Sequence, residues 1–350
     1  MGDDARQVPD AGDLEAALLG GPRTLTDRDL AERAGISAEL VTDLWRILSL
    51  PRVEHGEPVF TELDAAAIGR LAELMRVHDL SMSTVVSLVR AVGHNGDRVA
   101  MWQVEALVED LAAHGDRDDR AARLELLARL PALVGPLEEL VVYAYRRQLA
   151  AVAGRYTSEF ASTESRPYDA QTLPLARAVG FADMVSFTRT TAGLGPAELS
   201  AFVQGFEARV RDVVGAHGGR IIKTIGDGAL FVADDPVAGA LVATHLAEAF
   251  TAHVRPKRAR PAPPHDVSLR VSLVWGNLLS RFGDVFGAPV TLASRLCDVA
   301  RPGTVLVDPA TAQVLATDPR FVLVEQPSCE LTGLGTVTPW DLSLVRAGQG

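Results

Sequence analysis

Apolar residues recur three and four positions apart through the first 155 residues of the chain, as at Val104, Leu107 and Leu111. This spacing puts apolar side chains on one face of a helix, and it predicts a series of amphipathic helices. Glycine and proline commonly mark helix ends. We therefore expect a last helix from residue 136 to 156 and helix breaks at Gly20-Gly21, Pro51, Gly93, Gly115 and Pro131.

Beyond residue 175 the hydrophobic pattern changes. Short apolar runs typical of strands, such as GRIIKTIGDGALFVA and VSLRVSLVWGN, alternate with helical periods at about 196–216, 236–253 and 290–300. This alternation predicts a mixed sheet with helices packed on it, an α+β domain. The predicted organisation is a helical domain at 1–157, a polar linker with two prolines at 158–174 and the α+β domain at 175–345.

The composition excludes several classes of protein. Apolar residues make up 47% of the 350 residues, and the net charge of −11 disfavours a coat for nucleic acid or for an anionic membrane. Two cysteines form no disulfide framework, so a reducing compartment is expected. No apolar run is long enough for a membrane span, and the acidic amino terminus lacks the features of a secretory signal. We expect a cytoplasmic protein.

The run FADMVSFT contains the first candidate chemistry. A strand that ends at Asp183 and turns into a helix-starting segment exposes a carboxylate beside free backbone amides. Amides of this kind, around Met184 to Phe187, suit a triphosphate, because unpaired N–H groups and the helix dipole favour anions. A plain capping aspartate is the alternative.

The run IIKTIGDGALFV predicts a tight hairpin whose tip, Gly226-Asp227-Gly228, carries an acid. An ordinary Asp-Gly turn is the simpler interpretation. If the hairpin lies beside the strand that ends at Asp183, however, the two carboxylates can pair. Together with nucleotide phosphates they provide the hard oxygen ligands that Mg²⁺ or Mn²⁺ prefers.

The run GDVFGAPVTLASRL places Asp284 at a probable strand end and Arg295 on the helix that follows. Arginine stays charged at all relevant pH values and can neutralise phosphate oxygens as charge develops on a leaving pyrophosphate. An arginine on an exposed helix face is ordinarily only solvated. Arg295 is therefore a functional candidate only because of its spacing from the other two runs.

These three runs, in this order, resemble the catalytic domain of class III adenylate and guanylate cyclases over about residues 175–343. The resemblance implies a ferredoxin-like βαββαβ core with extra strands, working as a head-to-tail homodimer with active sites between the subunits and two Mg²⁺ or Mn²⁺ ions at each site. Implied metal ligands are Asp183, Asp227 and the carbonyl of Met184. Implied catalytic residues are Arg295 and Thr291. Implied substrate-binding residues are Lys223, Asp284, Arg270, Met184, Val185, Ser186, Phe187 and Thr188.

The residues implied to read the purine favour adenine on chemical grounds. Lysine only donates hydrogen bonds and an ionised aspartate only accepts them. Adenine offers an acceptor at N1 and a donor at its exocyclic amine, which suits Lys223 and Asp284, whereas guanine offers the reverse. Each mismatched buried group costs about 1–3 kcal/mol. The sequence therefore predicts ATP rather than GTP.

Two departures from the family pattern leave a second function open. Thr291 stands where the family usually has an asparagine that orients the ribose, and the stretch with Thr332 and Leu334 lacks a phosphate-binding lysine. Arg270 or the basic, proline-rich segment 254–265 is a candidate replacement for that charge; a solvated loop is the simpler interpretation of the segment. A catalytically weak, nucleotide-binding regulator is therefore the alternative.

The stretch LTDRDLAERAGISAELVTDLW predicts two short helices around Ala34-Gly35-Ile36-Ser37, like a helix-turn-helix. A transcription regulator is therefore a third hypothesis. Residues 1–150 hold 16 basic and 26 acidic residues, a net charge of −10. A DNA-binding surface needs cations that replace released counterions, so the charge favours a packing role and no nucleic-acid partner.

An acidic helical region before a cyclase domain is also the layout of actinobacterial cyclases with an autoinhibitory, pH-responsive module, which this chain resembles in layout alone. On physical grounds we expect the helical half to dimerise and to set the distance between the catalytic halves. A pH or small-molecule signal would act on this half. Histidines that titrate near neutral pH are the candidates for a pH signal: His55, His78, His94 and His114.

Overall fold

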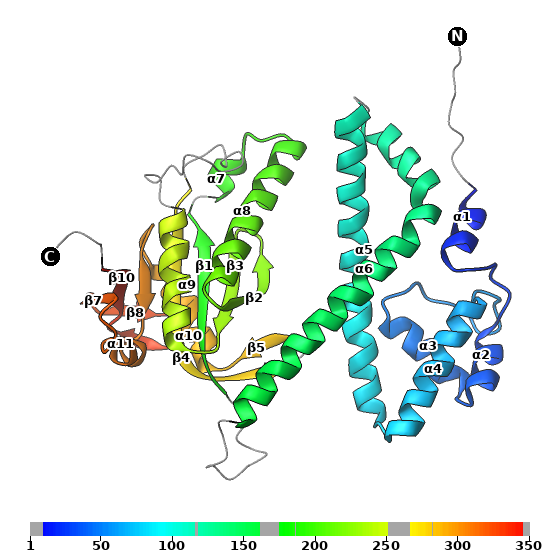
Figure 1. The fold of residues 1–350 in the computed structure, drawn as a ribbon, viewed down its shortest axis with the longest axis horizontal. Coiled ribbons are helices and arrows are strands. Elements are labelled where there is room, and N and C mark those ends of the chain that lie inside the picture. Colours follow the sequence, from blue (N-terminus) through cyan, green and yellow to red (C-terminus); the bar gives the residue numbers. More distant parts are fainter. Residues whose placement is uncertain are drawn as a thin grey trace. The chain divides into compact units, whose positions relative to one another are not determined.

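The computed structural model describes residues 10–115, 118–161, 175–185, 187–250, 267–281 and 283–345. They belong to two compact units, Met1–Arg166 and Pro167–Gly350, so the division falls within the expected linker. Ser186 and the basic segment 254–265 lie outside the described residues. Figure 1 colours the chain from blue at the amino terminus to red at the carboxyl terminus.

The described part of the first unit contains helices and one isolated β-bridge, as the hydrophobic periodicity predicts. The long helices α5 and α6 lie side by side over part of their lengths (Figure 1) and share an apolar cluster of Val108, Leu111, Ala122 and Leu126. The helices are α1 (Ala11–Leu18), α2 (Asp27–Ala34), α3 (Ala38–Ile47), α4 (Glu62–His78), α5 (Met82–Gly115) and α6 (Asp119–Ala161).

The predicted helix-turn-helix is formed by α2 and α3. Thr26 caps α2 in a capping box, and Gly35 ends it with a φ of 67°, a left-handed conformation that glycine adopts without steric cost. The Ser37 hydroxyl then accepts a hydrogen bond from the Leu40 amide and starts α3. These cap residues give the two helices their fixed ends.

Two of the expected helix breaks are wrong, because α5 continues through Gly93 and α6 through Pro131. A Cβ on Gly93 would lie 2.6 Å from the Cα of Leu48, so this glycine lets α5 pass close to the end of α3 instead of ending the helix. Pro131 lacks one amide donor, yet α6 packs against α5 on the turns before it and continues beyond it. Tertiary packing therefore outweighs the local preference at both positions.

The last helix of the first unit ends later than expected. Helix α6 continues to Ala161, past the expected end at residue 156, so the first four residues of the predicted linker are helical. No proline occurs between Pro136 and Pro167, and nothing in that stretch forces an earlier end.

A buried carboxylate ties the loop after α3 to the start of α2. Asp27 is 1% exposed, and its Oδ2 lies 2.6 Å from Nδ1 of His55. Its Oδ1 accepts hydrogen bonds from the amides of Gly56, at 2.9 Å, and Arg28, at 3.0 Å. Burial alone raises the pKa of Asp27, but the hydrogen bonds, that of His55 first, outweigh burial and hold the pKa below its usual value.

The second unit is an α+β domain, as predicted. Its helices are α7 (Phe187–Thr191), α8 (Pro196–Ala216), α9 (Pro236–Ala249), α10 (Ala288–Val299) and α11 (Pro309–Leu315). Its strands are β1 (Leu175–Met184), β2 (Gly219–Ile225), β3 (Gly228–Ala233), β4 (Leu269–Arg281), β5 (Asp284–Phe286), β6 (Val305–Val307), β7 (Phe321–Glu325), β8 (Cys329–Leu331), β9 (Gly335–Val337) and β10 (Trp340–Leu344).

The main sheet has the strand order β2-β3-β1-β4-β6-β10-β7, with β5 paired to β4. The order β4-β1-β3-β2 with α8 and α9 as the connecting helices is the ferredoxin-like βαββαβ arrangement, so the predicted fold class is confirmed. Helices α8 and α9 cover one face through Phe206 and Leu246, and α10 covers the other through Ala293 and Leu296. Figure 1 shows these helices around the central strands.

None of the described helices is both long enough and apolar enough to cross a membrane. This agrees with the hydrophobic pattern of the sequence.

The close approach at Gly93 gives a first prediction. We expect Gly93→Ala to destabilise the first unit by about 1–3 kcal/mol, because the new methyl group overlaps the Leu48 backbone. Hydrogen exchange of α3 and α5, measured in the full chain, reports the loss. Gly96→Ala is the matched control, since a Cβ there meets nothing within 4 Å, and alanine should slightly stabilise the helix. Equal effects at both positions would refute the packing explanation.

The Asp27 contacts give a second prediction. The pKa of Asp27 is lower in the folded protein than in the unfolded chain. Its carboxylate therefore stabilises the unit at pH values above the usual pKa, and this stabilisation is lost as the pH falls through the folded pKa. Asp27→Asn should lower the unfolding free energy at neutral pH by about 1–3 kcal/mol, and the difference should shrink in acid. Urea unfolding across pH measures it, with the exposed Asp43→Asn as control. A difference that does not depend on pH would contradict this account.

Candidate active site

The candidate side chains on β1 and β4 lie on the face of the sheet that α10 covers. Side chains alternate between the faces of a strand. Phe181 packs in the α10 cluster, and the Ser272 hydroxyl donates to the Ala293 carbonyl of α10 at 2.6 Å. Asp183 follows Phe181 by two residues on β1, and Arg270 precedes Ser272 by two residues on β4. The side chains of Asp183 and Arg270 therefore lie on the same face. They are also direct cross-strand partners.

The hairpin of β2 and β3 brings a second carboxylate beside Asp183. Gly228 pairs directly with Asp183, and Gly226 makes the turn with a φ of 59°. Within this turn the Asp227 carbonyl accepts a hydrogen bond from the Met184 amide at 3.1 Å. The predicted proximity of Asp183 and Asp227 is therefore present in a single chain.

Electrostatics at this carboxylate pair match a cation site. Burial raises the pKa of Asp183 above its usual value; the hydrogen bond from Arg270 acts in the opposite direction, and the negative charge of Asp227 raises the pKa further. A divalent cation between the two acids would relieve both the repulsion and the desolvation. The donor set, two carboxylates with nearby backbone oxygens, suits Mg²⁺ or Mn²⁺. No group of three or more metal-ligating side chains occurs in the described ranges.

Arg270 reaches across the register to Asp183, with its Nη2 2.6 Å from Oδ2. Its Nη1 makes only a long contact of 3.4 Å to the carbonyl of Asp298, and its Nε is buried with no hydrogen-bond partner among the described residues. The guanidinium is thus held mainly by the carboxylate implied as a metal ligand.

A β-bulge in β2 brings the Lys223 side chain within hydrogen-bonding distance of Asp284. The register of β2 against β3 shifts between Ile221 and Lys223, so Ile222 is an extra residue. Such a shift reverses the face on which the following side chains lie. Lys223 therefore pairs with Leu230, whose side chain is in the α10 cluster.

The Lys223 Nζ donates to Asp284 Oδ2 at 2.5 Å, and Asp284 is the first residue of β5. Burial alone would raise the pKa of Asp284, but the hydrogen bond from Lys223 and that from the Val285 amide outweigh it and lower the pKa. The carboxylate therefore stays ionised and accepts hydrogen bonds only. The sequence predicted both residues but not the bulge that brings them together.

Helix α10 carries the two candidate catalytic residues. Thr291 is exposed in its first turns. The Arg295 Nη1 donates to Asp298 Oδ2 at 3.1 Å, and the Arg295 Nε is buried and has no hydrogen-bond partner among the described residues. Asp298, which the sequence analysis missed, therefore contacts both arginines, through its carboxylate and its carbonyl. The three-residue spacing from Arg295 on a helix was the available signal.

The segment after Asp183 corrects one expectation. The amide of Met184 donates to Asp227 and that of Val185 to Ser268 at 2.9 Å, so these two amides are engaged within the protein and are not free for phosphate. First-turn amides of a helix lack intrahelical partners, and Phe187 and Thr188 occupy that position in α7. They remain the candidates for a phosphate contact.

The missing lysine near the carboxyl terminus has no replacement at its own position. Thr332 and Leu334 lie exposed in the turn between β8 and β9. These two positions offer a hydroxyl and an apolar side chain, and no positive charge.

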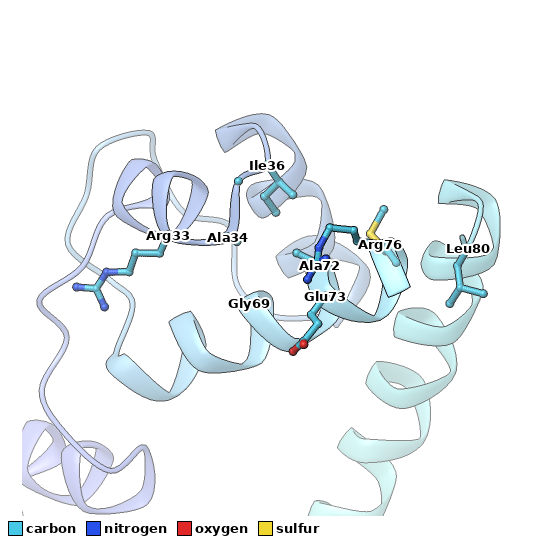
Figure 2. A pocket seen from close by; sticks show the side chains of 10 residues that line it. Arg33, Ala34, Ile36, Gly69, Ala72, Glu73, Arg76 and Leu80 are labelled. Atoms are coloured by element: carbon cyan, nitrogen blue, oxygen red, sulfur yellow. The ribbon is translucent and has the colours of Figure 1, made fainter. Parts of the chain in front are cut away.

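A hollow of about 580 Å³ lies in the first unit, away from these residues in sequence (Figure 2). The turn after α2 and one side of α4 line it, with small residues such as Gly69 and Ala72 and the charged Arg33, Glu73 and Arg76. None of the predicted site residues lines it.

The chain is similar to known proteins over most of its length. The family model of the adenylate and guanylate cyclase catalytic domain matches residues 176–343. A protein of Glutamicibacter nicotianae named adenylate cyclase is 40% identical over 96% of this chain and 82% of its own length. A pH-sensitive adenylate cyclase of Mycobacterium tuberculosis is 27% identical over 86% of this chain and 73% of its own.

One similar solved structure is the catalytic core of a rhodopsin–guanylyl cyclase with converted specificity, in complex with ATPαS. The similarity covers 49% of this chain and 98% of the other chain. Its sequence identity is 20% and its TM-score 0.44. The chain belongs to the adenylate and guanylate cyclase family.

Proposed function

We propose that the chain is an adenylate cyclase that converts ATP to 3′,5′-cyclic AMP and pyrophosphate in the cytoplasm. The ion pair of Lys223 and Asp284 is the observation that carries the proposal. One donor and one ionised acceptor, fixed side by side, match N1 and the exocyclic amine of adenine and oppose the edge of guanine. Relatives that match most of the chain are named adenylate cyclase, which supports this substrate.

The reaction joins the ribose 3′-oxygen to the α-phosphorus, releases the 3′-hydroxyl proton and expels pyrophosphate. Asp183 and Asp227 would hold two Mg²⁺ or Mn²⁺ ions, with the Met184 carbonyl as a further ligand. Bound metal would activate the 3′-hydroxyl and neutralise charge on the transferring phosphorus. The mutual repulsion of the two carboxylates supports this assignment.

The remaining residues would bind and position the nucleotide. Arg295 would stabilise charge on the leaving pyrophosphate, and Thr291 would contact the ribose with its hydroxyl. Arg270 would bind the triphosphate, in line with its unpartnered Nε. The amides of Phe187 and Thr188 would add phosphate contacts.

We further propose that each site is shared between two copies of the chain. Exposed apolar side chains lie on the strands of the purine-reading pair: Ile225 on β2, with Lys223, is 57% exposed, and Phe286 on β5, with Asp284, is 48% exposed. Leu279 on the adjoining β4 is 42% exposed. Leu279 and Phe286 are cross-strand partners on β4 and β5. Exposed apolar side chains grouped around a polar pair are typical of an interaction surface, and a second catalytic unit would cover them.

Helix α6 offers a dimerisation surface in the first unit. Val142, Tyr145, Leu149 and Val152 follow alternating steps of three and four residues, the heptad spacing of coiled coils. The first three are 49%, 65% and 52% exposed. The residues of α6 that share a cluster with α5 end at Leu133, so this stripe, hereafter the α6 seam, lies beyond that contact. A parallel second copy would bury the seam.

Dimerisation through the α6 seam gives the helical unit a route to regulate catalysis. A rotation within a parallel pair would change the distance between the catalytic units that follow it. His55 is the candidate for a pH signal, because it contacts the buried Asp27, whereas His114 contacts only the exposed Asp110. One relative is named for pH sensitivity.

A catalytically weak, nucleotide-binding regulator remains the alternative, because Thr291 in place of asparagine and the missing lysine would both lower turnover. The transcription-regulator hypothesis has less support. Glu39, Asp43 and Arg46 are the exposed charged side chains of α3, the second helix of the helix-turn-helix, and a DNA surface needs more cations.

Turnover of ATP tests the proposal. Full-length protein with ATP and Mn²⁺ should form cyclic AMP, measured by chromatography, and Asp227→Ala should abolish it. Lys223→Met should lower kcat/KM for ATP about 10- to 100-fold, because it leaves adenine N1 and Asp284 without their donor. Arg211→Met, an exposed cation on α8, is the matched control and should leave the rate unchanged. Nucleotide binding without product would favour the alternative.

Cysteine cross-linking tests the α6 seam. In a Cys329→Ser background, Leu149→Cys should form a disulfide-linked dimer on mild oxidation, because seam positions face their own copies in a parallel pair. Arg147→Cys, on the opposite side of α6, is the control. The remaining Cys297 does not interfere, since burial raises the pKa of its thiol to about 12. Equal cross-linking at 147 and 149, or none at 149, would rule out a parallel seam.

A further inference from the structure

The contact between Arg270 and Asp183 places a protein cation on the oxygen that a metal ion would take. Nη2 of Arg270 lies 2.6 Å from Oδ2 of Asp183, and both side chains are about one-third exposed. The two residues are direct partners in the β1–β4 ladder, so the backbone holds them opposite one another. A metal ion on Oδ2 would lie close to this guanidinium, and the two positive charges would repel each other.

The same guanidinium is poorly satisfied where it lies. Among the described residues its five N–H donors find one strong acceptor, Asp183, and one distant carbonyl at 3.4 Å, that of Asp298. Nε is buried without a hydrogen-bond partner among the described residues, which is unfavourable for a polar donor. A phosphate group, which accepts two parallel N–H bonds from arginine, would satisfy it better.

We propose that Arg270 is the counter-ion of Asp183 in the nucleotide-free enzyme and must move to the triphosphate before metal occupies Asp183. Arg270 therefore couples the binding of metal to the binding of nucleotide. This inference rests on the proposed function, because it takes Asp183 as a metal ligand and a nucleoside triphosphate as the incoming anion. It adds a positioning role that phosphate binding alone does not include.

The coupling has a definite sign. Without nucleotide, a metal ion must displace Arg270 and leave its guanidinium without a strong acceptor, so metal binds weakly. With nucleotide, the phosphates take the guanidinium and Asp183 is released. Because coupling between two ligands is reciprocal, metal strengthens nucleotide binding by the same factor. A protein without the guanidinium loses this coupling but binds bare metal more tightly.

Mn²⁺ titration of the nucleotide-free full-length protein, followed by the electron paramagnetic resonance of free Mn²⁺, tests the proposal. Arg270→Met keeps the apolar stem and removes the cation, and it should bind Mn²⁺ about tenfold more tightly, equivalent to about 1.4 kcal/mol. Arg211→Met changes the net charge equally on α8 and should bind like wild type. Adding Asp183→Asn to Arg270→Met should remove the gain.

A second titration separates this role from a merely structural one. A non-hydrolysable ATP analogue should tighten Mn²⁺ binding in wild type and do so much less in Arg270→Met. Arg270→Lys, which keeps the charge without the planar fork, should lie between them and serves if the methionine variant is unstable. Unchanged or weaker Mn²⁺ binding by Arg270→Met, or an undiminished effect of the analogue, would overturn the proposal.

The activity assay keeps this inference distinct from the cyclase proposal. If wild type makes cyclic AMP while Arg270→Met shows no tighter Mn²⁺ binding, the counter-ion role fails and the cyclase function stands. If wild type makes no cyclic AMP yet Arg270→Met binds Mn²⁺ tightly through Asp183, the counter-ion role stands without the cyclase function.

Discussion

The antiparallel pairing of β1 with β3 and β4 is the constraint on which the rest of the site depends. It sets Asp183 opposite Gly228 on one side and Arg270 on the other. A slip by one residue would turn the carboxylate to the face covered by α8 and α9. The core prevents that slip, because a Cβ on Gly180 would lie 2.2 Å from the Phe231 ring, so only glycine fits there. The packing that stabilises the sheet therefore also fixes the face on which the Asp183 carboxylate lies.

Much of this arrangement is readable from the sequence because it is local. The hairpin tip with Asp227 follows from an Asp-Gly pair between two apolar runs, and the helix-turn-helix follows from Gly35 and its neighbouring caps. The order of the three motif runs pointed to the family, and the fold class follows from it. Fixed local chemistry, at turns and caps, is where a single sequence is most informative.

What the sequence could not supply depends on contacts between distant residues. The bulge at Ile222 exists only against β3, and without it Lys223 would lie on the other face of the sheet. The amides of Met184 and Val185 looked free because their acceptors lie some 40 and 80 residues away in sequence. Gly93 looked like a break because its neighbour, the backbone of Leu48, belongs to another helix. Tertiary packing decided each case.

The charges of the site suggest how a nucleotide changes it. Each candidate cation already has an acid: Lys223 has Asp284, Arg270 has Asp183 and Arg295 has Asp298. Under the proposed function the first pair persists when nucleotide binds, because adenine needs a donor and an acceptor together. The third is exposed at 42% and 61%, so water and salt screen it and it opens readily. The second is more enclosed, at 32% and 36%, and under the proposed counter-ion role it opens only if both partners gain substitutes. With a net charge of −11, the chain as a whole repels a triphosphate at long range. Under the proposed counter-ion role, binding depends on local exchanges, in which phosphate and metal replace the partners that Arg270 and Asp183 give up.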